Sequence, residues 1–256
     1  MELPPITRKQ LQILLLLYSY RFLNRQHIQT ILKHKDPHRI KSWLTDLTQK
    51  EYLNRIYSKT FPENTKPAIY HLNLKSKKIL EEQPNINTNL LKRIYREKIR
   101  SRTFIDHHLS LADTYITLLA LERENNVTMQ FFPKTLLADH RYLLKPLPDA
   151  YFVLTDPSTT KRYFIETLDD QMPRFAIRNR IQQYVDYADS REWESHTKHP
   201  FPAILFVCPN VTLKKYVQRF ITQTLEEDIV DLSFHLTTPE EIKQGEINLV
   251  EYNTLG

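Results

Sequence analysis

The chain has 256 residues, of which 41% are hydrophobic and 26% charged, and a formal net charge of +6; this length suits one large domain or two small ones. Two glycines are too few for a P-loop or a dinucleotide fingerprint. The single cysteine, Cys208, excludes an internal disulfide, and its apolar run "PAILFVCPN" predicts a buried strand. "LQILLLLYSY" is too short to span a membrane and lacks signal-peptide flanks. We therefore expect a cytoplasmic protein without a membrane partner.

Charge is distributed unevenly along the chain. Residues 1–103 contain 21 Lys and Arg against 8 Asp and Glu, a net +13, whereas the remainder contains 15 against 22, a net −7. A basic portion joined to an acidic one suggests that the first portion contacts nucleic acid. The alternative is a generally basic, solvated surface.

Three short helices are predicted near the N-terminus, because three segments each combine a capping residue with an apolar stripe. Thr7 precedes the first, Asn24 the second, and Asp36 with Pro37 the third. The third helix is expected to turn four apolar residues inward: Ile40, Trp43, Leu44 and Leu47. Short helices with tight links fit a helix-turn-helix core.

A β-hairpin is predicted after these helices. Residues 52–57 and 68–72 have extended character on either side of a polar loop, and "LKSKKILEE" reads as a closing helix. The order helix, helix, helix, hairpin predicts a winged-helix DNA-binding domain over residues 1–84.

The third helix and the wing carry the residues that we expect to contact duplex DNA. Arg39 suits a guanine edge in the major groove, and Lys41 suits a phosphate. The predicted contacts are His38, Arg39, Lys41, Ser42 and Thr45 on the helix, and Lys59, Asn64 and Lys66 on the wing. The alternative use of a winged helix is protein docking.

Residues 85–103 are predicted to form a basic connecting helix. A run of cations is often only a solvated face, but this run extends a basic module and therefore favours phosphate contact. Its predicted DNA-binding residues are Lys92, Arg93, Arg96 and Arg100.

Residues 104–256 have the pattern of an α/β domain. A long amphipathic helix precedes three strand-like runs, and a helix that Pro173 opens follows them. A continuous apolar run, another helix and a last strand complete the order α-β-β-β-α-β-α-β. This order predicts a mixed sheet flanked by helices.

Two carboxylates mark a candidate site within this domain. Pro148 and Asp149 precede one predicted strand, and Glu166 lies near the end of the next, an arrangement that resembles the PD-(D/E)XK nuclease core. The resemblance implies Asp149 and Glu166 as catalytic residues that hold Mg²⁺ against a scissile phosphate. It also implies a lysine two residues after the glutamate, where this chain has Leu168.

Other residues are candidates for the missing position. Arg178 or Arg180 on the following helix could take the lysine's place, although an arginine stays protonated and is a poor general base. Asp169 lies three residues after Glu166, one residue beyond the position that Leu168 occupies. In a strand its side chain would therefore point to the opposite face, unless a bulge turns it back toward the site. Gln183 and Tyr187 could still line a phosphate groove.

The chain as a whole resembles the replication-relaxation family, plasmid and mobile-element proteins with a winged helix before a nuclease-like domain. The family pattern has an aspartate two residues after the glutamate, where Leu168 stands here. The resemblance is carried by the opening helices "TRKQLQILLLLYSYRFLNRQHIQTIL", the wing end "AIYHLNLKSKKIL", the helix start "DHHLSLADTYITL" and the segments "LPDAYFVL", "YFIETLDD" and "RNRIQQYVDY".

Three functions are open at this point. The first is a sequence-specific DNA-binding protein acting in replication, mobilisation or its regulation, with a degenerate nuclease-like domain and no required cofactor. Its expected partners are double-stranded DNA, a second copy of the chain on a repeated site and other proteins of the same element. The second is a Mg²⁺-dependent endonuclease or nickase, and the third is a protein-docking adaptor without nucleic acid.

Overall fold

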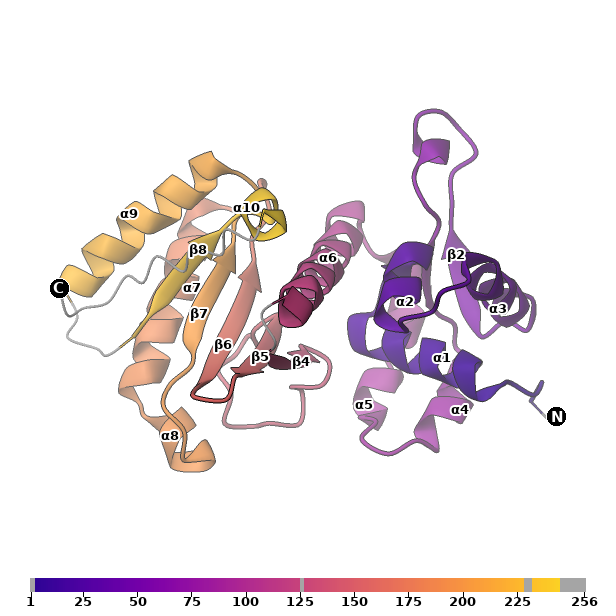
Figure 1. The fold of residues 1–256 in the computed structure, drawn as a ribbon, viewed down its shortest axis with the longest axis horizontal. Helices are drawn as coiled ribbons and strands as arrows, with labels where there is room; N and C mark the ends of the chain where they lie inside the picture. Colours follow the sequence, from indigo (N-terminus) through magenta and orange to yellow (C-terminus); the bar gives the residue numbers. More distant parts are fainter. Residues whose placement is uncertain (1–2, 125–126, 228–231, 245–256) are drawn as a thin grey trace. The chain divides into compact units, whose positions relative to one another are not determined.

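The computed structural model describes residues 3–124, 127–227 and 232–244, which fall into two compact units, Met1–Ile116 and Thr117–Gly256 (Figure 1). The boundary between the units lies within one long helix, α6 (Arg102–Glu124). Within the described ranges, no helix is long and apolar enough to cross a membrane. The predicted α/β class, with a mixed sheet flanked by helices, is confirmed.

The N-terminal unit packs helices against a three-stranded antiparallel sheet with the strand order β1-β3-β2. The predicted helices, the hairpin and the closing helix are all present. In chain order the elements before α6 are α1 (Arg8–Tyr20), β1 (Leu23–Asn24), α2 (Arg25–Ile31), α3 (Pro37–Gln49), β2 (Leu53–Ile56), η1 (Glu63–Thr65), β3 (Ile69–Leu72), α4 (Ser76–Glu81), α5 (Thr88–Leu91) and η2 (Ile94–Ile99).

The three predicted N-caps are confirmed. Side-chain oxygens of Thr7, Asn24 and Asp36 accept hydrogen bonds from backbone N–H groups in the first turns of α1, α2 and α3, at 3.3, 2.9 and 2.8 Å. Each such bond satisfies a donor that the helix leaves unpaired and stabilises its helix by about 1 kcal/mol. The capping residue alone therefore predicts where each of the three helices begins.

The connecting segment 85–103 is not the single helix that the sequence suggested. It consists of α5, which has four residues, followed by the 3₁₀-helix η2. Ile94 and Glu97, three residues apart within η2, are both buried. A 3₁₀-helix, with three residues per turn, places such residues on one side, whereas an α-helix would spread them.

The C-terminal unit is built on a five-stranded sheet with the order β4-β5-β6-β7-β8. Strands β4, β5 and β6 pair antiparallel, and β6, β7 and β8 pair parallel. The predicted element order is confirmed, with two further short helices, α8 and α10. The elements are β4 (Thr128–Pro133), β5 (Ala150–Thr155), β6 (Thr160–Thr167), α7 (Arg174–Asp189), α8 (Glu192–Thr197), β7 (Ala203–Val207), α9 (Val211–Glu227), β8 (Phe234–Thr237) and α10 (Pro239–Lys243).

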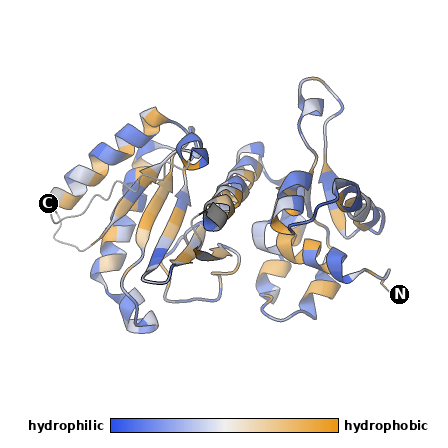
Figure 2. Ribbon diagram, in the orientation of Figure 1, coloured by the Kyte–Doolittle hydropathy of each residue, from blue (hydrophilic) through white to orange (hydrophobic). Residues whose placement is uncertain are grey.

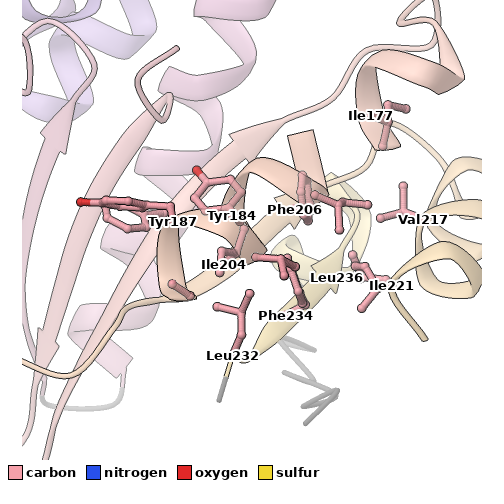
Figure 3. Close-up of a cluster of buried hydrophobic side chains, with 14 of the residues drawn as sticks. Ile177, Tyr184, Tyr187, Ile204, Phe206, Val217, Ile221, Leu232, Phe234 and Leu236 are labelled. Atoms are coloured by element: carbon pink, nitrogen blue, oxygen red, sulfur yellow. The ribbon is translucent and has the colours of Figure 1, made fainter. Parts of the chain in front are cut away.

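The main core of this unit lies between the sheet and helices α7 and α9, which run along one of its sides (Figure 1). The strands are coloured as mostly hydrophobic in Figure 2, and Figure 3 shows Phe206 and Phe234 among side chains from both helices. Fully burying one such side chain contributes about 1.5–3 kcal/mol. Cys208 is buried as predicted, just after β7, and burial raises the pKa of its thiol to about 12.

Candidate functional site

Asp149 and Glu166 lie at the same end of neighbouring strands. Asp149 immediately precedes β5, and its backbone N–H donates to the carbonyl oxygen of Ile165 at 3.0 Å. Its carboxylate oxygen Oδ2 accepts a hydrogen bond from the backbone N–H of Thr167, also at 3.0 Å. Both carboxylates are buried, with 6% and 8% of each residue exposed. The two residues singled out from the sequence are therefore held beside each other.

Glu166 is bound by two side chains of α7. Its Oε1 atom accepts hydrogen bonds from Nη2 of Arg180 and from the hydroxyl of Tyr184, both at 2.6 Å. Arg180 and Tyr184 lie one turn apart on the buried face of the helix, and the guanidinium carbon is 4.7 Å from the tyrosine ring centroid. Arg180 also donates to the carbonyl oxygen of Pro146 at 2.8 Å. This is a buried ion pair inside the unit, formed through Oε1 of Glu166.

The ionisation of these groups follows from their burial. Burial raises the pKa of Glu166, the guanidinium of Arg180 opposes that rise, and the nearby charge of Asp149 adds to it. Burial alone would lower the pKa of Arg180, but the charge of Glu166 and its hydrogen bond, together with Tyr184 and Asp149, outweigh burial and the pKa is raised. Burial also raises the pKa of Tyr184, which keeps its hydroxyl a donor. An arginine stays protonated in proteins, so Arg180 is a permanent cation beside the carboxyl group of Glu166.

A second cation, Lys134, lies beside Asp149. Lys134 follows β4 directly, and its backbone N–H donates to the carbonyl oxygen of Asp149 at 2.8 Å. Its Nζ atom is 3.4 Å from Oδ1 of the same aspartate. The site thus contains two carboxylates and two cations, and their formal charges cancel.

The residues present do not fit a resident Mg²⁺ ion. Mg²⁺ requires near-octahedral oxygen ligands, of which proteins usually supply one or two carboxylates. Here Oε1 of Glu166 already accepts two short hydrogen bonds, and Asp149 and Glu166 are already balanced by Arg180 and Lys134. Adding a dication would leave the four groups with a net charge of +2 unless a cation moved away. In the described part of the chain, no three His, Cys, Asp or Glu side chains gather as a metal cluster.

Asp169 and Arg178, two candidates for the role of the missing lysine, do not bond to Glu166 in any contact among the described residues. Leu168, which occupies the lysine's position in the sequence, packs into the hydrophobic core. In the turn that follows, Oδ1 of Asp169 accepts a hydrogen bond from the backbone N–H of Gln171 at 2.9 Å. Arg178 is exposed and donates to the hydroxyl of Tyr216 at 3.0 Å. Of the residues proposed for that position, Arg180 is the one that bonds to Glu166.

The two residues expected to line a phosphate groove are also engaged or buried. The side-chain oxygen of Gln183 accepts from Arg180 at 3.1 Å. Tyr187 is buried, and its hydroxyl has no hydrogen-bond partner among the described residues.

Sequence reasoning missed Tyr184, Lys134 and the carbonyl of Pro146. Tyr184 carried a usable signal, because it stands four residues after Arg180 on a predicted helix and such residues share a face. Lys134 became visible only with the register of β4 against β5, which pairs Pro133 with Ala150. A sequence does not fix that register without knowledge of the connection between the strands.

The predicted DNA-binding residues of the N-terminal unit are mostly on its surface. All five on α3 are exposed, and so are the three on the hairpin and Lys92, Arg93 and Arg96. Lys66 forms an ion pair with Glu63 at 2.8 Å. Arg100 differs from the others: it is half-buried, with its guanidinium carbon 4.5 Å from the ring centroid of Phe104.

Comparison with known proteins identifies the family of the chain and a distant structural likeness. No curated protein matches the chain. Two solved structures of the restriction endonuclease FokI, one of them bound to DNA, are similar at 13% and 14% sequence identity with a TM-score of 0.34. Each match covers 94% of this chain and 44% of the FokI chain, so the protein spans under half the length of that relative. The replication-relaxation family model matches residues 14–203, about three quarters of the sequence, and the chain belongs to that family.

Proposed function

We propose that this protein binds duplex DNA through a winged helix in its N-terminal unit and acts in the replication or mobilisation of a plasmid or other mobile element. The observation that carries the proposal is the exposed, basic outer side of α3. Its opposite side buries Ile40, Leu44 and Leu47, so His38, Arg39 and Lys41 project into solvent. Membership of the replication-relaxation family supports the process.

The surroundings of α3 support a nucleic-acid partner over a protein partner. Residues 1–103 have a net charge of +13, and such a surface attracts phosphate and releases counterions when it binds. The hairpin β2–β3 ends in a loop that carries the exposed Lys59 and Asn64. Phe61 at this loop is 83% exposed, and a large apolar side chain in that position suits insertion against bases.

The nuclease-like unit, in this proposal, positions DNA or a partner and does not cut. Glu166 is bonded to Arg180 and Tyr184, and Leu168 stands where the nuclease resemblance implies a lysine. Lys134 lies beside Asp149 and could steady a water, but a metal bound through Oε1 of Glu166 would first have to displace Arg180 and Tyr184. A nicking enzyme is therefore the second candidate, which Lys134 favours and the Glu166–Arg180 pair opposes.

Arg39→Ala combined with Lys41→Ala is expected to weaken DNA binding by about 10- to 100-fold. A base contact contributes about 1–3 kcal/mol, and a lost phosphate contact lowers the slope of log K against log salt by about 1. Fluorescence anisotropy with labelled duplex, selected from a random library and titrated at several salt concentrations, measures both quantities.

The matched control is Lys215→Ala combined with Arg219→Ala on α9, which removes the same charges from exposed helix positions of the other unit. This control should leave affinity within about twofold. Equal weakening by both double variants would mean that only net charge matters and would remove α3 as the reading helix. Absence of any duplex binding at low salt would favour the protein-docking adaptor.

Supercoiled plasmid is expected to stay intact with the protein in Mg²⁺ or Mn²⁺, because a metal bound through Oε1 of Glu166 or Oδ1 of Asp149 would have to displace Arg180 or Lys134. Agarose gels over several hours measure nicking and linearisation. Nicking that Asp149→Ala abolishes would establish the nuclease instead. Nicking that persists in Asp149→Ala would identify a contaminating nuclease.

A further inference from the structure

The C-terminal unit contains a cavity of about 310 Å³ that the DNA-binding proposal does not use. It lies on the side of the sheet that carries α7 and α8, beneath the loop that joins β4 to β5. Cavities that bind small molecules start at about 300 Å³ and have mostly apolar walls with a few polar groups. The lining residues are Phe132, Leu137, His140, Tyr142, Leu143, Tyr151, Phe164, Trp193, Thr197 and His199.

The walls are aromatic. Phe132, Tyr151 and Phe164 are cross-strand neighbours on β4, β5 and β6 and form one continuous row. Trp193 of α8 meets this row, with ring centroids 5.4 Å from Tyr151 and 5.3 Å from Phe164. Tyr142 from the loop between β4 and β5 forms a further wall, with its ring centroid 6.2 Å from that of Trp193. Rings from a sheet, a helix and a loop thus converge on one space.

The geometry suits a flat ring. Tyr142 is already stacked on His196, with an interplanar angle of 10° and centroids 4.9 Å apart, so a planar partner is accepted on one of its faces. Aromatic pairs prefer offset stacks or edge contacts at centroid separations of about 4.5–7 Å, and the walls offer both arrangements to a guest ring.

Polar groups are placed for the edge of that ring and for an attached anion. His140, Thr197 and His199 are part of the lining and can donate or accept hydrogen bonds. Arg162 lies two positions before Phe164 on β6 and therefore on the same face of the sheet, which places a permanent cation next to the cavity but outside its lining.

We propose that this cavity binds a nucleotide, with the base packed against the aromatic walls formed by Tyr142, Tyr151 and Trp193 and the phosphate directed toward Arg162 at the edge of the cavity. A heterocycle with an aromatic face, a hydrogen-bonding edge and an attached anion matches the aromatic walls, the polar groups and the cation together. The nucleotide can be free or belong to an unpaired DNA strand, because the recognised chemistry is the same. The site lies within the C-terminal unit and does not depend on DNA binding by α3.

The test uses the fluorescence of Trp193 in the full chain. Trp43 and Trp193 are the two tryptophans, so Trp43→Phe leaves Trp193 as the reporter. We expect saturable quenching by deoxynucleoside monophosphates and none by deoxyribose 5-phosphate, which has no base. Four-base single strands and the same sequence as duplex form the second arm. Stronger quenching by single strands than by free nucleotides identifies a DNA strand as the source, and the reverse order identifies a free nucleotide.

Variants of one wall residue locate the binding. In the Trp43→Phe background, Tyr142→Leu should weaken nucleotide binding roughly 5- to 150-fold, the range found when a ring stacked on a base is removed. Tyr142→Phe keeps the ring and should stay within about threefold of the parent. Tyr216→Leu, on α9 and outside the cavity lining, is the matched control for loss of a half-buried tyrosine and should leave binding unchanged.

Three results would overturn the proposal. The first is no saturable quenching by any nucleotide or strand up to millimolar concentration. The second is equal quenching by deoxyribose 5-phosphate, which would make the contact one of charge alone. The third is the same affinity in the Tyr142→Leu and Tyr216→Leu variants. A fall in affinity with circular dichroism unchanged supports it even where the stability of Tyr142→Leu is lower.

Discussion

Arg180→Leu is expected to lower the free energy of unfolding of the C-terminal unit by about 3–5 kcal/mol. Removing one member of a buried ion pair leaves the other charge without compensation, and the loss is of this size. Glu166 would keep its hydrogen bond from Tyr184 but would lose the cation at 2.6 Å. Urea unfolding at pH 7, followed by Trp193 fluorescence in the Trp43→Phe background, measures the change.

The stability lost in Arg180→Leu is expected to depend on pH, because the ionisation of Glu166 changes. Without Arg180 the pKa of Glu166, already raised by burial, rises further because its main opposing interaction is gone. A carboxyl whose pKa is raised by folding contributes stability that is complete below the pKa of the unfolded chain and is lost as the pH rises through the folded pKa. The gap in stability between variant and parent should therefore be largest at pH 7 and shrink toward about pH 4.3, the pKa of an unfolded glutamate.

Two further variants separate the ion pair from a general effect of lost arginine. Arg178→Leu removes an exposed arginine two positions away on α7 and should change stability by less than about 1 kcal/mol. Arg180→Leu combined with Glu166→Leu removes both charges and should recover much of the loss, since apolar replacements of a buried pair are often neutral. If Arg180→Leu costs no more than Arg178→Leu, the pair does not stabilise the unit.

The elements that the sequence predicted well are those whose signals are local. Thr7, Asn24 and Asp36 each mark a helix start through one hydrogen bond to a neighbouring turn, and all three appear where expected. The buried strand before Cys208 was equally legible, because a strand covered on both faces is apolar throughout. Local chemistry decides these features, so no knowledge of the rest of the fold was needed.

The candidate site was predicted only in part, because its remaining partners are remote in sequence. Asp149 and Glu166 were found from the strand pattern, but Lys134 reaches Asp149 through the pairing of β4 with β5. The prediction of one helix over residues 85–103 was wrong for a related reason. Tertiary contacts bury Ile94 and Glu97, which are three residues apart, and this spacing favours a 3₁₀-helix.

The arrangement around Glu166 gives a physical reason for the proposed absence of cleavage. A buried carboxylate without a cation is costly, so Glu166 needs a positive charge beside it, from a protein side chain or from a metal. Arg180 supplies it from the buried face of α7, and a stable pair then resists replacement by Mg²⁺. The same residue that keeps the unit folded is thus expected to keep it from cutting, and the plasmid assay and the unfolding assay report on one structural feature.

Glu97→Gln in the N-terminal unit is expected to cost about 2–3 kcal/mol of stability. Glu97 is buried, and its Oε1 accepts from Nη2 and Nε of Arg21 at 2.5 and 3.1 Å. Arg21 has a φ of 68°, in a turn where the N–H of Phe22 donates to the carbonyl oxygen of Tyr20 at 2.8 Å. Such a γ-turn is strained for any residue with a Cβ, and the ion pair holds it in place. The estimate is below that for Arg180 because the Arg21 side chain is 26% exposed.

The controls for this prediction test charge and strain separately. Glu82→Gln removes an exposed carboxylate from the same unit and should change stability by less than about 0.5 kcal/mol. Arg21→Ala and Arg21→Gly both remove the ion pair, but glycine adopts a φ of 68° freely, so the glycine variant should be more stable by about 1 kcal/mol. Equal stability of these two variants would show that the turn stores no strain.

Because Glu97 anchors η2, whose Arg96 is exposed, Glu97→Gln should also weaken DNA binding at temperatures where the unit is still folded.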